Sequence, residues 1–149
     1  MIEIRDIGID DIESLAQLYR NFWNENYTEN FDVQKMKSKF TEIQTNPAYI
    51  LLGAVEGDGI AGSVMGIVCE DLYGKCKPLL LLENMVVDSS YRKMGIGTKL
   101  YDELEKRAKE KGCRQIILVT EADREVACKF YESVGFHPTA NKGYKKRIY

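Results

Sequence analysis

The stretch YRKMGIGTKL, residues 91–100, constrains the fold of this chain more than any other. Two glycines, Gly95 and Gly97, stand two residues apart behind a basic pair, and an amphipathic pattern begins directly after them. The most strand-like run of the chain, residues 79–88, lies just before this stretch. An apolar run, a glycine turn and a helical pattern in this order predict a strand joined to a helix by a tight turn.

The rest of the chain supplies strands and helices that fit one sheet. A short strand is expected at residues 3–5, and Asp10 and Glu13 are expected to form a capping box at the start of a helix. The later elements expected are a helix opened by Asp32, strands over 49–56 and 60–71 joined by Gly57-Asp58-Gly59, a strand over 79–88, a helix stopped by Gly112, a strand over 114–120, a helix over 125–134 and a strand over 143–149. The order β-α-α-β-β-β-α-β-α-β predicts an α/β (α+β) fold with a mixed, mostly antiparallel sheet flanked by helices. Residues 1–149 are expected to form a single domain.

Charge and composition narrow the classes of partner. The net charge is only −2 with 30% charged residues, so we expect no nucleic-acid and no membrane partner. The first residues lack the basic and apolar regions of a signal peptide, which predicts a cytoplasmic protein. The four cysteines show no metal-ligand spacing with the single histidine, His137, so no metal site is expected.

The glycine turn is chemically suited to an anion. The first N–H groups of a helix lack partners and carry partial positive charge, and glycines let several of them converge on phosphate oxygens. A dinucleotide-binding fingerprint would need glycine near Leu100, and a Walker A motif would need Lys where Thr98 stands. Taken alone, such a turn is more often a tight connection than a binding site.

The flanking residues resemble a known family. Arg92-x-x-Gly95-x-Gly97, placed after an apolar strand, is similar to the acyl-CoA-binding signature (Q/R)-x-x-G-x-(G/A) of the GNAT acetyltransferase superfamily. FYESVGF, residues 130–136, is similar to the family's F-Y-x-x-x-G-F motif, with Ala127 at its usual place. The resemblance implies the GNAT acyl-CoA N-acyltransferase fold. It also implies an enzyme that transfers the acetyl group of acetyl-CoA to a primary amine of a small molecule, by direct attack in a ternary complex.

The resemblance also assigns the residues that hold acetyl-CoA. The pantetheine arm would run along the strand at Met85, Val86 and Val87, with the Met85 N–H facing the acetyl carbonyl. The pyrophosphate would lie on the turn residues Arg92, Lys93, Met94, Gly95, Ile96, Gly97 and Thr98. Ala127 and Arg124 lie at further cofactor positions, although members of the family often have Asn where Arg124 stands, so Arg124 is expected either to replace that contact or to bind phosphate.

Two residues are expected to move protons. Tyr131 matches the family's general acid, which protonates the departing CoA thiolate and also contacts the cofactor; otherwise it is a core aromatic. Glu83 is expected as the general base, because alternation on a strand puts it on the face of Met85 and Val87. The alternative for Glu83 is an ordinary ion pair with a base such as Lys77.

The acceptor amine stays open at this stage. The loop over residues 24–31 is expected to help bind it, and an amino sugar, an aminoglycoside, a polyamine or a peptide or protein amine all remain candidates. A non-catalytic acyl-CoA-binding module is a second class. It is disfavoured because such a module is expected to lack Tyr131 or Glu83, and both are present. A Cys–His hydrolase is a third, disfavoured because no nucleophile signature surrounds any cysteine. Many members of the family pair through edge strands, so a homodimer is also considered.

Overall fold

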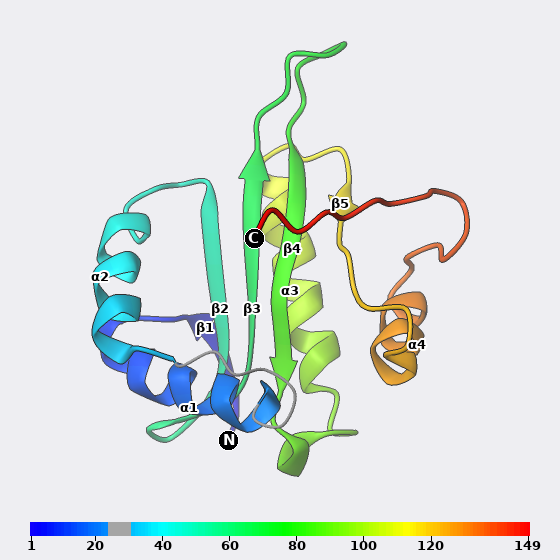
Figure 1. Ribbon diagram of the computed structural model, residues 1–149. Helices are drawn as coiled ribbons and strands as arrows, with labels where there is room; N and C mark the ends of the chain where they lie inside the picture. Colours follow the sequence, from blue (N-terminus) through cyan, green and yellow to red (C-terminus); the bar gives the residue numbers. More distant parts are fainter. Residues whose placement is uncertain (24–30) are drawn as a thin grey trace. The chain divides into compact units, whose positions relative to one another are not determined.

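The computed structural model describes residues 1–23 and 31–149. These residues form two compact units, Met1–Ile117 and Leu118–Tyr149. The elements of the first unit are β1 (Glu3–Asp6), η1 (Ile9–Asp11), α1 (Ile12–Trp23), α2 (Val33–Ile43), β2 (Tyr49–Glu56), β3 (Gly59–Cys69), β4 (Leu79–Val87), η2 (Ser89–Tyr91), α3 (Ile96–Glu110) and β5 (Ile116–Ile117), and the second unit contains α4 (Glu125–Ser133) (Figure 1). No helix of the described part is long and apolar enough to cross a membrane.

The described strands form one mixed sheet in the order β1-β2-β3-β4-β5. The first three pairings are antiparallel, and the last, between β4 and β5, is parallel. The expected fold class, a mixed and mostly antiparallel sheet with helices, is therefore confirmed.

Local signals in the sequence account for most element ends. Asp32 caps α2 by accepting a 3.1 Å hydrogen bond from the Lys35 N–H, and Gly112 follows α3 with φ +76°. Gly57, with φ +60°, lies in the turn that joins β2 to β3. The start of α1 differs from expectation: η1 precedes it, and the Asp11 carboxylate, not Glu13, accepts a 2.8 Å hydrogen bond from the Gly8 N–H.

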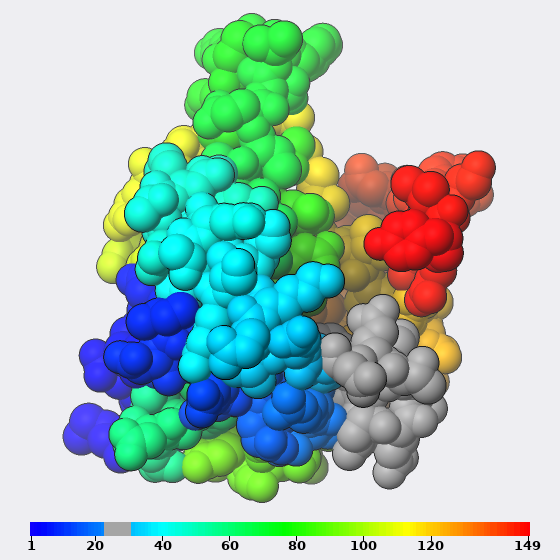
Figure 2. Space-filling model, turned by 60° about the vertical axis from the view of Figure 1, so that its left-hand side comes forward, coloured from blue at the N-terminus to red at the C-terminus, as the bar shows by residue number. Residues whose placement is uncertain are grey.

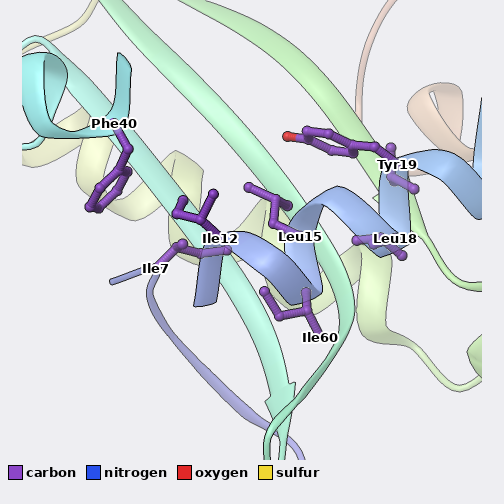
Figure 3. Packing of buried hydrophobic residues seen from close by; sticks show 8 residues of the cluster. Ile7, Ile12, Leu15, Leu18, Tyr19, Phe40 and Ile60 are labelled. Atoms are coloured by element: carbon purple, nitrogen blue, oxygen red, sulfur yellow. The ribbon is translucent and has the colours of Figure 1, made fainter. Parts of the chain in front are cut away.

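The core of the first unit lies on both faces of the sheet. One face packs against α1 and α2 through a cluster that joins Ile12, Leu15 and Tyr19 of α1 to Phe40 of α2 and Val86 of β4 (Figure 3). We call it the α1 face. The other, the α3 face, is close-packed: a Cβ built on Gly66 would lie 2.7 Å from Leu104 of α3. Helices α1 and α3 each bury the apolar face that their 3.6-residue periodicity predicts.

Of the two strands expected at the C-terminal end of the chain, one is shorter than the sequence suggests and the other does not form. Only Ile116–Ile117 of the expected strand over 114–120 pairs with β4. The strand expected over 143–149 is wrong, because this stretch has no strand structure. A strand exists through backbone pairing with a neighbour, whereas the stretch contacts its unit through a side chain, the 2.6 Å ion pair of Lys145 with Glu121.

Candidate active site

The strand β4 carries a bulge in its second half. On β3, Ser63 lies opposite Val86 and Met65 lies opposite Glu83, so two residues of β4, Asn84 and Met85, face one residue of β3. Asn84 adopts φ +52°, in the left-handed region that Asn enters more readily than most residues. A bulge of this kind bends the strand and changes the face on which later side chains stand.

The bulge corrects the expected arrangement of Glu83. Residues directly opposite each other on paired strands share a face. Glu83 therefore stands on the α1 face with Met65, and Val86 stands there with Ser63. Val87 lies opposite Gly62, whose Cβ position meets Ile96 and Leu100 of α3, so Val87 stands on the α3 face. The expectation that Glu83 and Val87 share a face is wrong, because simple alternation fails at an inserted residue.

Glu83 lies in apolar surroundings. It is half-buried on the α1 face, with Leu81 two residues before it on the same face of β4 and Met65 across from it on β3. Among the described residues it forms no ion pair, so the alternative pairing with Lys77 is not found. This is a placement that a general base can use, since no partner blocks the carboxylate.

One edge of β4 is free within the first unit. Strand β5 pairs with β4 at two positions, Leu80 with Ile116 and Leu81 with Ile117. Within the first unit the pairing ends there, whereas β4 continues to Val87. The backbone from Leu82 onward thus has no β5 partner there. An extended, hydrogen-bonding ligand can add to such an edge as a strand would.

The turn after β4 is held at its start by two carboxylates. The Asp88 side chain caps η2 through a 2.8 Å hydrogen bond from the Ser90 N–H. The Tyr91 hydroxyl donates a 2.7 Å hydrogen bond to Glu56 at the end of β2, and the nearby carboxylate raises the pKa of Tyr91. No local signal in the sequence indicates the pairing of Glu56 with Tyr91, because 35 residues separate them.

The turn itself opens onto the N-terminus of α3. Lys93 and Gly95 both have positive φ, +63° and +75°, and no side chain caps the helix. The first N–H groups of α3 accordingly have no intrahelical acceptors. A Cβ built on Gly95 would meet nothing within 4 Å, so glycine leaves the approach to these N–H groups clear. Arg92, Lys93 and Met94 are exposed beside it. The turn fits a pyrophosphate in its shape, its charge and its donors.

The remaining predicted residues belong to the second unit. Tyr131 lies on α4, half-buried, with its ring 5.4 Å from Phe130 and 5.8 Å from Phe136 by centroid. Arg124 stands exposed at the N-cap of α4, and Ala127 lies in the first turns of that helix. Arg124 also helps to lower the pKa of Glu121, after the larger contributions of Lys145 and Arg147. The structure joins Glu83, the β4 edge and the turn in one unit, and the part of Tyr131 in catalysis stays a prediction.

The expected acceptor loop and the four cysteines are the remaining features that the sequence singled out. Residues 24–30, the larger part of the expected acceptor loop, lie outside the described residues. Cys69, Cys76, Cys113 and Cys128 are free thiols. In the described part of the chain, no group of three or more His, Cys, Asp or Glu side chains is arranged to hold a metal ion.

Comparisons with known proteins agree with this geometry. A model of the acetyltransferase (GNAT) family matches residues 12–136. N-alpha-acetyltransferase 30 of Xenopus laevis is 34% identical over 84 residues, which cover 56% of this chain and 30% of that protein. Spermidine N(1)-acetyltransferase of Thermoplasma acidophilum is 26% identical over 148 residues, which cover 91% of this chain and 88% of the other. A putative acetyltransferase of Agrobacterium tumefaciens has a similar structure, with a TM-score of 0.88, 22% identity and coverage of 98% of this chain and 99% of that one. The chain thus spans less than a third of the length of the Xenopus relative.

Proposed function

The chain belongs to the acetyltransferase (GNAT) family, and from this premise we propose that it transfers the acetyl group of acetyl-CoA to a primary amine of a small molecule. The observation that carries the proposal is the succession of a free strand edge and an open, uncapped helix N-terminus. Acetyl-CoA has an extended pantetheine arm followed by a pyrophosphate. The edge of β4 past Leu81 suits the arm, and the turn at Arg92–Thr98 suits the pyrophosphate.

Acetyl-CoA supplies the activated acetyl group when it is bound. The backbone of Met85, Val86 and Val87 would hold its pantetheine arm, and the Met85 N–H would stabilise the negative charge on the carbonyl oxygen during attack. Removing a donor of this kind costs about 10²–10³ in rate in other enzymes. Arg92 and Lys93 would reach the outer side of the phosphates, while Arg124 and Ala127 would complete the cofactor site.

Glu83 and Tyr131 would handle the protons. An amine is mostly protonated at neutral pH and cannot attack a thioester in that form. Glu83, directly or through a water molecule, would take the proton from the ammonium group. The free amine would then bond to the acetyl carbon, the C–S bond would break, and Tyr131 would protonate the CoA thiolate that leaves.

The related proteins support acetyl transfer as the reaction more strongly than they support any one acceptor. One relative is named a spermidine acetyltransferase and another an N-alpha-acetyltransferase, so the names point to different acceptors. A small-molecule amine is favoured here because one relative, whose match covers 91% of this chain, is named for a small amine. Acetylation of a peptide amine is the second candidate, supported by the 34% identity to the N-alpha-acetyltransferase.

Three further properties belong to the same proposal. Residues 1–149 would act as one acetyltransferase domain. A cytoplasmic enzyme would keep its four cysteines as the free thiols that are found. A homodimer could form through β1, which lies at an edge of the sheet.

The proposal is tested by acetyl-CoA turnover against a panel of amines, with products identified by mass spectrometry. We expect one class of amine to be acetylated well above background. Glu83→Gln and Tyr131→Phe should each lower kcat by roughly 10²-fold or more, since each removes a proton-transfer group. Glu110→Gln and Tyr73→Phe are matched controls, because both residues are exposed and lie outside the proposed site. Unchanged rates in Glu83→Gln and Tyr131→Phe would contradict the assigned roles, and a chain that neither binds nor consumes acetyl-CoA would contradict the function.

A further inference from the structure

The α1 face of the sheet changes in burial along its strands. Gly53, Ser63 and Val86 form one cross-strand row, and all three are buried. The next row toward the β3–β4 connection joins Leu51, Met65 and Glu83, and its members are only half-buried.

One row further along, the same face is still apolar. Tyr49, Ile67 and Leu81 lie opposite one another across β2, β3 and β4, and all three are half-buried. We call the two half-buried rows the acceptor surface, which consists of Leu51, Met65, Glu83, Tyr49, Ile67 and Leu81. Both strands that carry most of this surface end at the β3–β4 connection; Figure 1 shows this connection projecting beyond the rest of the sheet, and Figure 2 shows it standing clear of the atoms around its base.

Charge on the acceptor surface is confined to one group. Glu83 is the charged residue of its two rows, and its five neighbours there are Leu, Met, Tyr, Ile and Leu. Lys39 of α2 lies near enough to Tyr49 for the two to interact electrostatically, and Lys39 is itself ion-paired with Glu42. At this border of the surface, an ammonium group would meet the positive charge of Lys39 and the Glu42 carboxylate, which is already paired with Lys39.

We infer that the acceptor is a monoamine with an apolar body, and not a polyamine or another polycation. The inference rests on the proposed function, because it takes Glu83 as the group that receives the amine. One ammonium group can pair with the Glu83 carboxylate while its hydrocarbon part covers Met65, Ile67 and Leu81. Against the six residues of the acceptor surface, the part of this face that the structure describes, a second ammonium group on the same body would be desolvated beside apolar side chains without a partner, and burial of an unpaired charge is costly.

The test compares two amines that differ in a single group. n-Pentylamine and cadaverine have the same five-carbon chain, and only cadaverine carries a second ammonium group. With the full chain and acetyl-CoA we expect kcat/KM for n-pentylamine to exceed that for cadaverine by at least about tenfold, since an unmatched polar group discriminates at least this strongly. Glucosamine serves as a monoamine with a polar body and should be a poorer substrate than n-pentylamine.

A variant gives the converse result. Ile67 lies two residues along β3 from Met65, the partner of Glu83, which places it about 7 Å farther along the strand. Ile67→Glu adds a second carboxylate there and should raise kcat/KM for cadaverine relative to n-pentylamine by about tenfold. In Ile67→Gln the new side chain has nearly the shape of the glutamate but no charge. It should leave the ratio of kcat/KM for cadaverine to that for n-pentylamine near the wild-type value.

Calorimetric titration of CoA into each protein separates the possible failures. If kcat/KM for cadaverine equals or exceeds that for n-pentylamine, the inference is overturned and the transferase proposal stands. The same holds if CoA binds but neither amine is acetylated. Absence of both CoA binding and turnover overturns the two together. An unchanged ratio in an Ile67→Glu protein that is folded by circular dichroism also counts against the inference.

Discussion

The Tyr91 hydroxyl donates a 2.7 Å hydrogen bond to the Glu56 carboxylate and thereby ties the segment before the glycine turn to the end of β2. Beyond Tyr91 the chain passes through two positive φ values before α3 begins. The contact is the last side-chain tether before the turn among those described. A turn held in its binding conformation loses less conformational entropy when it receives a ligand.

Tyr91→Phe should accordingly weaken CoA binding. The contribution of a solvent-exposed hydrogen bond is modest, so we expect the dissociation constant to rise by roughly twofold to fivefold. Calorimetric titration measures it directly. The KM for acetyl-CoA should rise similarly with kcat unchanged, whereas an effect on kcat alone would show that the contact does not act through the turn. Tyr73→Phe, at the exposed β3–β4 connection, is the matched control.

The bulge in β4 predicts a sharp preference at residue 84. Asn84→Gly should keep activity and stability near wild type, because glycine adopts a positive φ without steric cost. Asn84→Val places a β-branched residue at φ +52° and should cost about 1–3 kcal/mol of stability or shift the strand register. Thermal denaturation and acetyl-CoA turnover measured together would reveal either effect. Equal stability of the two variants would contradict the bulge.

Close packing between β3 and α3 predicts an effect at Gly66. The added methyl of Gly66→Ala would lie 2.7 Å from Leu104 and 3.1 Å from Leu80, so the helix or the side chains must shift. Overpacking of this kind costs about 1–3 kcal/mol, which urea denaturation would register as a lower midpoint. Gly143→Ala is the control, since a Cβ there meets nothing within 4 Å.

Burial of Tyr19 makes stability fall at alkaline pH. Desolvation raises the pKa of Tyr19 from its ordinary value near 10 to about 12, and a hydrogen bond with the Ser63 hydroxyl partly offsets this rise. The folded state therefore favours the protonated phenol. Its contribution to stability is complete below pH 10 and is lost as the pH rises toward 12, by up to about 2–3 kcal/mol. Over this range the unfolding free energy of the wild type should fall relative to that of Tyr19→Phe, and a difference that stays constant would contradict the assignment.

The sequence predicted those features that depend on local signals. Asp32 at a helix start and Gly112 at a helix end are caps, and their residue types determine what the neighbouring backbone can do. The placement of the glycine turn between β4 and α3 follows from periodicity in the same way. These features need no knowledge of distant residues.

Other features depend on distant residues and could not be predicted in this way. The bulge at Asn84 exists only relative to β3, although the preference of Asn for positive φ was a signal that could have indicated it. The pairing of Tyr91 with Glu56 depends on the sheet register. The stretch over 143–149 has the composition of a strand, but a strand also needs a partner.

Binding of CoA to the turn over residues 92–98 is the most direct test of the account. Thermal denaturation would be recorded for the full chain with and without saturating CoA and desulfo-CoA, which lacks the thiol but keeps the pyrophosphate. The account predicts that both raise the melting temperature, and that Gly95→Val, which adds a side chain where the approach is now open, removes most of the increase. A melting temperature that neither compound changes in the wild-type protein would contradict the central claim.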